Sequence, residues 1–139
     1  MKTYEIETEI EAEPDAVWRI LTKVLPSEPV PFGILRLEGE ISLGSRIKLW
    51  AEVSPKQAFK LKVERFEAPH EMVWKGGMPF GLFVGTRTFS VERTHHGSTF
   101  RMKEIFSGPM AGLIAKSIPD LTPSFEKFAA TLKQKAEQK

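Results

Sequence analysis

Alternating side chains mark the beginning of the chain. Residues 4, 6, 8, 10 and 12 are Tyr, Ile, Thr, Ile and Ala, and residues 5, 7, 9 and 11 are all Glu. A period of two predicts a strand with one face buried and the other in solvent. From Pro14 the apolar residues recur at helical spacing as far as Pro26, which predicts a helix of about three turns. Residues 26–33 contain three prolines and predict an irregular connection or at most a single turn.

The period of two returns after residue 34 and continues to residue 107. In the first three of these strands, the positions predicted to share the inner face are Leu37, Gly39, Ile41, Ile47, Leu49, Ala51, Val53, Phe59, Leu61 and Val63. Further strands are predicted at 71–75, 82–92 and 98–106, with turns at 43–45, 54–56, 68–70 and 95–97. Because parallel neighbours need a crossover of a dozen or more residues, connections this short predict an antiparallel sheet.

The spacing becomes helical again after Pro109. One stripe would carry Leu113, Ile114, Leu121, Phe125, Phe128, Ala129 and Leu132, and Pro119 and Pro123 are expected to kink or interrupt it. The order of elements predicts an α+β fold, with an antiparallel sheet of six to seven strands and one long C-terminal helix. Since a helix is only about 10 Å across, such a sheet must curl around it or leave apolar surface open. Curling would leave a cavity between the sheet and the helix.

Composition narrows the class of protein. The 139 residues are 41% apolar and 27% charged, which predicts one domain over 1–139 with its own core. The absence of cysteine excludes a disulfide scaffold, a thiolate zinc site and thiol catalysis, and it favours a reducing compartment. The net charge is +2 and the basic residues are spread along the chain, so no nucleic-acid partner is expected.

The first residues bear on location. They are acidic, unlike a secretory signal, and no apolar run in the chain approaches the ~18 residues of a membrane span. We therefore expect a cytoplasmic protein without a stable membrane anchor. The sequence leaves its oligomeric state open.

Two charges fall on the apolar side of the last two predicted strands. Arg87 shares a phase with Phe83 and Phe89, and Glu104 shares one with Met102 and Phe106. If the hairpin turns at residues 95–96, Arg87 lies opposite Glu104. Burying a charge costs several kcal/mol unless it is paired. In a purely structural role, the two charges satisfy each other and fix the strand register, or a bulge turns Arg87 to solvent. In a functional role, they form the polar end of a cavity that binds a carboxylate or a polarised carbonyl.

Apolar side chains on the inner faces would form the remaining wall. The candidate ligand-binding residues beside the two charges are Phe59, Phe83, Phe89, Met102, Phe106, Leu121, Phe125 and Phe128. The glycine-rich loop 76–81 either caps the core with Phe80 or forms a mobile rim together with Phe32. Met78 and Phe80 are its candidate rim residues. Tyr4 begins the first strand on its inner face, as a core or rim residue or as a hydrogen-bond donor into the cavity.

Familiar catalytic arrangements are missing from the sequence. His70, His95 and His96 all fall in predicted turns, and no HExxH, Walker loop, GxGxxG or nucleophile elbow is present. We therefore expect no metal site and no cofactor.

The combination of elements resembles the START-like, birch-pollen-allergen-like superfamily, also called SRPBCC, and within it the bacterial polyketide cyclase/dehydrase-like proteins. The matching stretches are Ile10-x-Ala12-x-Pro14-x-x-Val17-Trp18-x-x-Leu21, Leu43-Gly44-Ser45-Arg46-Ile47, Val63 through Ala68-Pro69 to Val73-Trp74-Lys75-Gly76, Gly85-x-Arg87-x-Phe89, Gly97-Ser98-Thr99, Glu104-x-Phe106-Ser107-Gly108 and a terminal helix ending in Leu132-Lys133-x-x-Ala136-Glu137. The resemblance covers nearly the whole chain and implies a helix-grip fold with a hydrophobic cavity. Many relatives carry His where this chain has Arg87, a departure that replaces a possible base with a fixed cation.

Three functions remain open at this point. The first is binding, and possibly transport, of a small hydrophobic or amphipathic molecule such as a lipid or a polyketide-like compound. The second is a cyclase or dehydratase-like enzyme in which Arg87 polarises a carbonyl and Glu104 moves a proton. The third is a protein-interaction module without a ligand, as in co-chaperone-like relatives of that superfamily.

Overall fold

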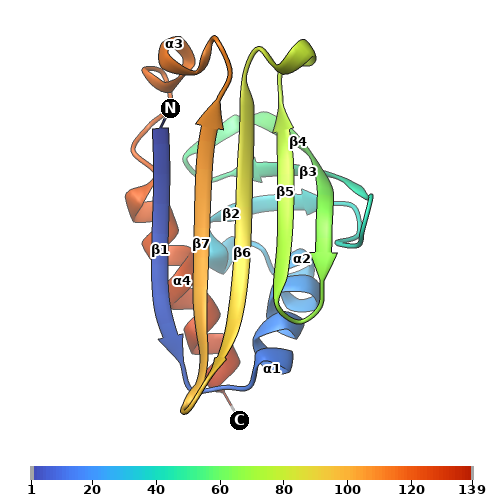
Figure 1. Cartoon of the computed structure of the whole chain (residues 1–139), viewed down its shortest axis with the longest axis vertical. Helices are drawn as coiled ribbons and strands as arrows, with labels where there is room; N and C mark the ends of the chain where they lie inside the picture. The colour runs from blue at the N-terminus through green and yellow to red at the C-terminus, as the bar shows by residue number, and fades with distance from the viewer. Residues whose placement is uncertain (1, 139) are drawn as a thin grey trace.

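One curled antiparallel sheet forms the body of the molecule (Figure 1), whose computed structural model describes residues 2–138. Its seven strands are β1 (Lys2–Ile10), β2 (Ile34–Glu38), β3 (Arg46–Ala51), β4 (Ser54–Glu67), β5 (Glu71–Gly77), β6 (Val84–Thr94) and β7 (Gly97–Ser107). They follow the order β1-β7-β6-β5-β4-β3-β2, so the chain's first strand pairs with its last. The α+β class, the antiparallel pairing and the strand number agree with the sequence prediction.

The long helix α4 (Thr122–Glu137) lies across the concave face of the sheet, behind β1 and β7 in Figure 1. Its buried stripe is Phe125, Phe128, Ala129 and Leu132, as its helical spacing predicted. Pro123 stands in its first turn, where the missing N–H is harmless. Prolines therefore separate α4 from the short helix α3 (Ala111–Ala115), as expected. Leu113 of α3 is 67% exposed, so its assignment to the buried stripe is wrong: α3 sits at the end of the sheet and not on its face.

The first helix is longer than its sequence predicted. It runs through α1 (Pro14–Arg19), the π-helical turn η1 (Ile20–Val24) and α2 (Leu25–Ser27), past the proline expected to end it. The N–H of Leu25 donates to the carbonyl of Ile20, five residues back, and this wider spacing accommodates Pro26. A single 3-10 turn, η2 (Val30–Phe32), follows, which agrees with the prediction of at most one turn.

Two strand boundaries also differ from the prediction. β2 ends at Glu38, and Ile41 is buried from within a loop. The turn between β3 and β4 lies at residues 52–53 and not at 54–56, because Ser54 already pairs with Ala51. Pro55 then falls where β4 bulges away from β3, so its missing N–H breaks no ladder bond.

A candidate ligand-binding cavity

A cavity of about 540 Å³ lies between the concave face of the sheet and the first half of α4. Its walls come from β2 to β7, from η2, from α3 and from the segment that joins α3 to α4. The predicted binding residues that line it are Phe59, Phe83, Arg87, Met102, Glu104, Phe106, Leu121, Phe125 and Phe128. The structure therefore brings these side chains together around one space, as the alternating pattern of the strands led us to expect.

Three predicted site residues are placed differently from the prediction. Phe89 is fully buried in the core, with its ring centroid 4.6 Å from that of Trp74 and 6.0 Å from that of Phe128. Phe32 is a wall residue and not part of a rim, because it is 2% exposed and packs against Phe128. Phe80 is 98% exposed and does not line the cavity. Met78 is the one predicted rim residue that lines the cavity and remains partly exposed, at 39%.

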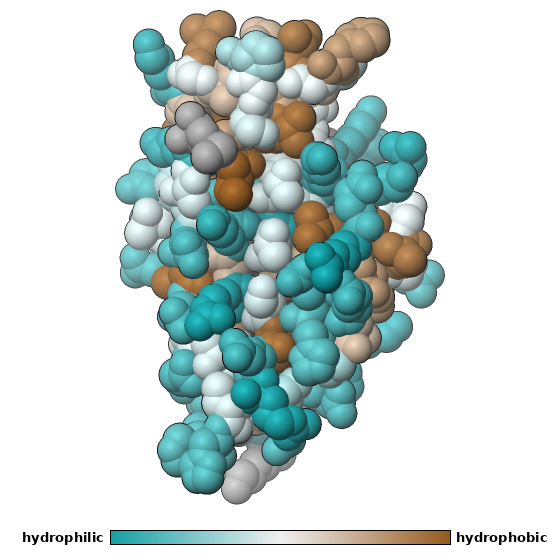
Figure 2. Space-filling view, in the orientation of Figure 1, coloured by the Kyte–Doolittle hydropathy of each residue, from teal (hydrophilic) through white to brown (hydrophobic). Residues whose placement is uncertain are grey.

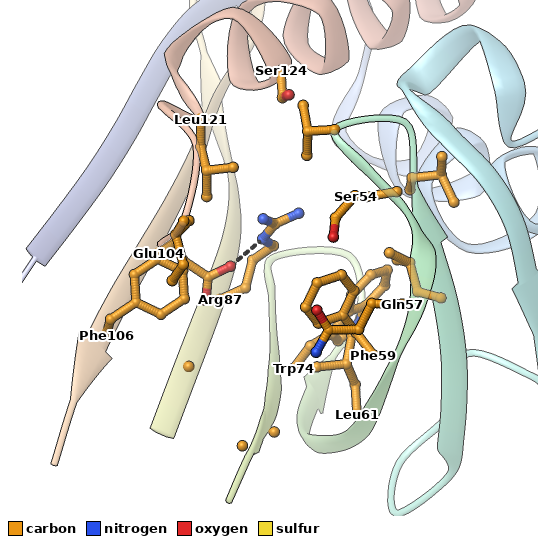
Figure 3. Close-up of a pocket in the computed structure, with 18 of the residues that line it drawn as sticks. Ser54, Gln57, Phe59, Leu61, Trp74, Arg87, Glu104, Phe106, Leu121 and Ser124 are labelled. Atoms are coloured by element: carbon orange, nitrogen blue, oxygen red, sulfur yellow. Dashed lines mark hydrogen bonds and ion pairs between the residues drawn. The ribbon is translucent and has the colours of Figure 1, made fainter. Parts of the chain in front are cut away.

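An ion pair forms the polar end of the cavity (Figure 3). Arg87 and Glu104 are direct cross-strand partners on β6 and β7, and the Nε of Arg87 donates to Oε1 of Glu104 at 2.9 Å. The two side chains are 22% and 11% exposed. The pairing of β6 with β7 has no register shift, so no bulge turns Arg87 to solvent. The guanidinium also lies 5.0 Å from the ring centroid of Phe125, which adds a cation–π contact.

Further hydrogen-bond donors lie at the same level of the sheet. Tyr4, Glu104, Arg87 and Trp74 are successive cross-strand neighbours on β1, β7, β6 and β5. Within residues 2–138, the hydroxyl of Tyr4 and the indole N–H of Trp74 are buried and have no hydrogen-bond partner. Tyr4 packs against Phe106 and Phe125 as a core residue and does not line the cavity. This row therefore carries more donors than acceptors.

Gly85 leaves space beside the ion pair. A Cβ at this position would lie 3.3 Å from Cε1 of Phe106 and 3.4 Å from Oε2 of Glu104. Any side chain here would press on both residues. The glycine therefore keeps the Glu104 carboxylate reachable from the cavity.

Several lining residues escaped the sequence analysis. Trp74 has the inner phase of its predicted strand, the same signal that identified the phenylalanines. Ser54, Gln57 and Ser124 give the wall further polar groups (Figure 3). No comparable signal identified them, because Ser54 was assigned to a turn and Ser124 lies off the apolar stripe of its helix.

The histidines lie outside the cavity wall. Nδ1 of His70 donates to the carbonyl of Val91 at 3.1 Å, and His95 and His96 form the turn between β6 and β7. Among the described residues, no group of three His, Cys, Asp or Glu side chains is placed to hold a metal ion. In the same part of the chain, no helix combines the length and the apolar character needed to cross a bilayer.

Comparison with known proteins places the fold. No protein-family model and no curated protein matches the sequence. Among solved structures, protein MLL2253 from Mesorhizobium loti superposes with a TM-score of 0.73 at 19% identity, over 96% of each chain. The chain has the helix-grip fold. Protein NE0264 from Nitrosomonas europaea is similarly close, with a TM-score of 0.71 at 13% identity, over 98% of this chain and 94% of that one.

A further neighbour bears on the predicted family resemblance. BexL, described as a di-domain ARO/CYC from the BE-7585A biosynthetic pathway, matches 99% of this chain over 50% of its own length, with a TM-score of 0.72 and 14% identity. The resemblance to the START-like (SRPBCC) superfamily is confirmed as a likeness of fold. At these identities it extends no further than the fold, so function rests on the cavity itself.

Proposed function

We propose that this protein binds a small, mainly apolar molecule in the cavity under α4. The observation that carries the proposal is the cavity of about 540 Å³, with phenylalanine walls and one ion pair at its end. This volume lies within the usual range of small-molecule sites, roughly 300 to 1,000 Å³. A few polar groups in an apolar wall are the arrangement that orients an amphipathic ligand.

The polar end favours an uncharged acceptor. Arg87 gives one N–H to Glu104, and its terminal nitrogens remain available to donate. The charges of Arg87 and Glu104 cancel, so a bound carboxylate would place two anions beside one cation in an apolar wall. A carbonyl or phenol oxygen accepts from Arg87 without that penalty. The ligand class that fits is therefore an apolar molecule with a carbonyl or hydroxyl group at one end.

A titration with two ligands of equal shape tests this proposal. Acetonaphthone and naphthoate carry a ketone and a carboxylate on the same ring system, and both can displace the uncharged fluorophore N-phenylnaphthylamine. We expect the ketone to bind about tenfold more tightly than the acid, the equivalent of ~1.4 kcal/mol. Ser124→Trp fills the cavity from α4 and should abolish binding of both. Glu126→Trp, on the exposed side of the same helix, is the matched control and should bind normally.

Two outcomes would contradict the proposal. If neither the fluorophore nor the ketone binds to the folded protein, the cavity is not a ligand site. If the two tryptophan variants behave alike, binding occurs outside the cavity.

The enzyme hypothesis rests on Glu104. It is the one carboxylate among the residues that line the cavity, and its Oε2 faces the space left by Gly85. Its other oxygen accepts a hydrogen bond from Arg87, which holds the carboxylate in the wall where it could take a proton from a ligand. Turnover that disappears in Glu104→Gln while ketone binding persists would identify an enzyme. The third hypothesis, an interaction module with a solid core, is disfavoured by the cavity.

A further inference from the structure

One end of the molecule exposes a group of large apolar side chains. Phe80 in the turn η3 (Pro79–Gly81) is 98% exposed, Leu113 in α3 is 67% exposed, and Met78 and Leu82 are 39% and 37% exposed. The two segments are held together, since the N–H of Met110 donates to the carbonyl of Leu82 at 2.9 Å. Figure 2 shows the resulting brown surface at the top of the molecule, over α3 and η3. We call this end the apolar tip.

The apolar tip is almost free of charge. Residues 76–86 contain no Asp, Glu, Lys or Arg, and residues 105–119 contain one, Lys116. Over the whole chain these four residue types make up 27% of positions. A contiguous exposed apolar surface of this kind marks an interaction site more often than isolated exposed residues do.

The backbone presents Phe80 outward. Its φ is 60°, in the left-handed region that bulky residues rarely adopt, and Gly81 beside it has φ 67°. The phenyl ring contributes nothing to the core from this position. The loop therefore holds an aromatic ring in solvent, against both its backbone preference and its hydrophobicity.

A basic patch lies next to the apolar tip on the outer face of the sheet. Arg46, Lys62 and Lys75 are successive cross-strand neighbours on β3, β4 and β5, and Lys48 lies opposite Lys60 one step nearer the tip. Lys75 directly precedes the charge-free segment. Within the described residues none of these five cations takes part in an ion pair. Like charges placed opposite each other destabilise a sheet, so the patch gains stability when an anionic surface approaches it.

From these two surfaces we propose that the apolar tip and the basic patch dock the protein reversibly on an anionic phospholipid membrane. Phe80 and Leu113 enter the headgroup region, while the lysines of the patch lie over the lipid phosphates. Met78 of the tip also lines the cavity, as do Ile114 and Ile118. The docked cavity therefore lies close to the bilayer, where apolar molecules dissolve. This proposal does not depend on the identity of the cavity ligand.

A membrane fits better than a second copy of the chain. Two copies meeting through their apolar tips would bring two basic patches toward each other. Anionic lipid supplies both an apolar layer for the tip and negative charge for the patch, in one plane. The charge of the patch therefore favours the membrane.

Flotation with lipid vesicles tests this proposal. We expect the wild-type protein to float with vesicles of phosphatidylglycerol and phosphatidylcholine in equal parts, and not with phosphatidylcholine alone. Phe80→Ser should weaken vesicle binding about tenfold, and Lys62→Gln with Lys75→Gln should reduce both the binding and its salt dependence. Val30→Ser removes an apolar side chain that is 56% exposed but lies outside the tip, and it should float like the wild type.

Three results would overturn the membrane proposal. They are failure of the wild-type protein to float with anionic vesicles, equal flotation of the Phe80→Ser and Val30→Ser variants, and a dimer in solution that Phe80→Ser dissociates. Phe80→Ser should also keep the wild-type affinity for N-phenylnaphthylamine, because Phe80 does not line the cavity. Loss of flotation with normal dye binding separates membrane docking from cavity binding.

Discussion

The Arg87–Glu104 pair sets the chemistry of the cavity at the scale of single residues. Each charge is largely removed from water, and each has the other as its partner. Such a pair adds little net stability compared with apolar residues of the same size, but loss of one partner strands the other charge. The proposed ligand binding therefore explains its presence in an aromatic wall better than a contribution to stability does.

A double-mutant cycle tests this interpretation. Glu104→Leu leaves the Arg87 guanidinium without its carboxylate, and we expect the free energy of unfolding to fall by about 2 kcal/mol. Arg87→Met combined with Glu104→Leu should recover most of that loss, since no buried charge remains. Urea denaturation of the single and double variants measures both values. A double variant that is no more stable than Glu104→Leu would contradict this interpretation.

At the scale of elements, the C-terminal end of α4 is hydrogen-bonded to the segment that follows β1. The carboxylate of Glu137 accepts the backbone N–H of Glu11 at 2.8 Å and the ammonium of Lys133 at 2.7 Å. These two bonds, the first more than the second, hold the pKa of Glu137 below its ordinary value. The contact ties α4 to the chain just after β1 and so helps to keep the helix on the sheet.

Because its pKa is lower in the folded protein, Glu137 stabilises the fold above its ordinary pKa of 4.5, and this contribution disappears as the pH falls below that value. Glu137→Gln should therefore lower the unfolding free energy by roughly 0.5 kcal/mol at neutral pH, a small amount because the pair is partly exposed. The difference between variant and wild type should vanish in acid. Thermal unfolding at several pH values measures it, and a difference that is constant with pH would contradict the assignment.

At the scale of the whole molecule, periodicity predicts the elements but not the division between core and cavity. Phe89 and Phe106 have the same inward phase on paired strands, yet one is covered by Phe128 and the other faces the cavity. That difference depends on where α4 crosses the sheet, and the periodicity of a single strand does not predict this position. The exposure of Phe80 likewise follows from a left-handed backbone at one residue. The register of Arg87 and Glu104 was predictable, because a tight turn and two alternating strands determine it.

The central claim is that the cavity under α4 binds an apolar molecule whose polar end meets Arg87. A crystal structure of the protein with acetonaphthone tests it most directly. We expect the naphthalene rings between Phe59, Phe106 and Phe125, with the ketone oxygen about 2.9 Å from a terminal nitrogen of Arg87. A ligand bound outside the cavity, or one whose ketone points away from Arg87, would contradict the claim.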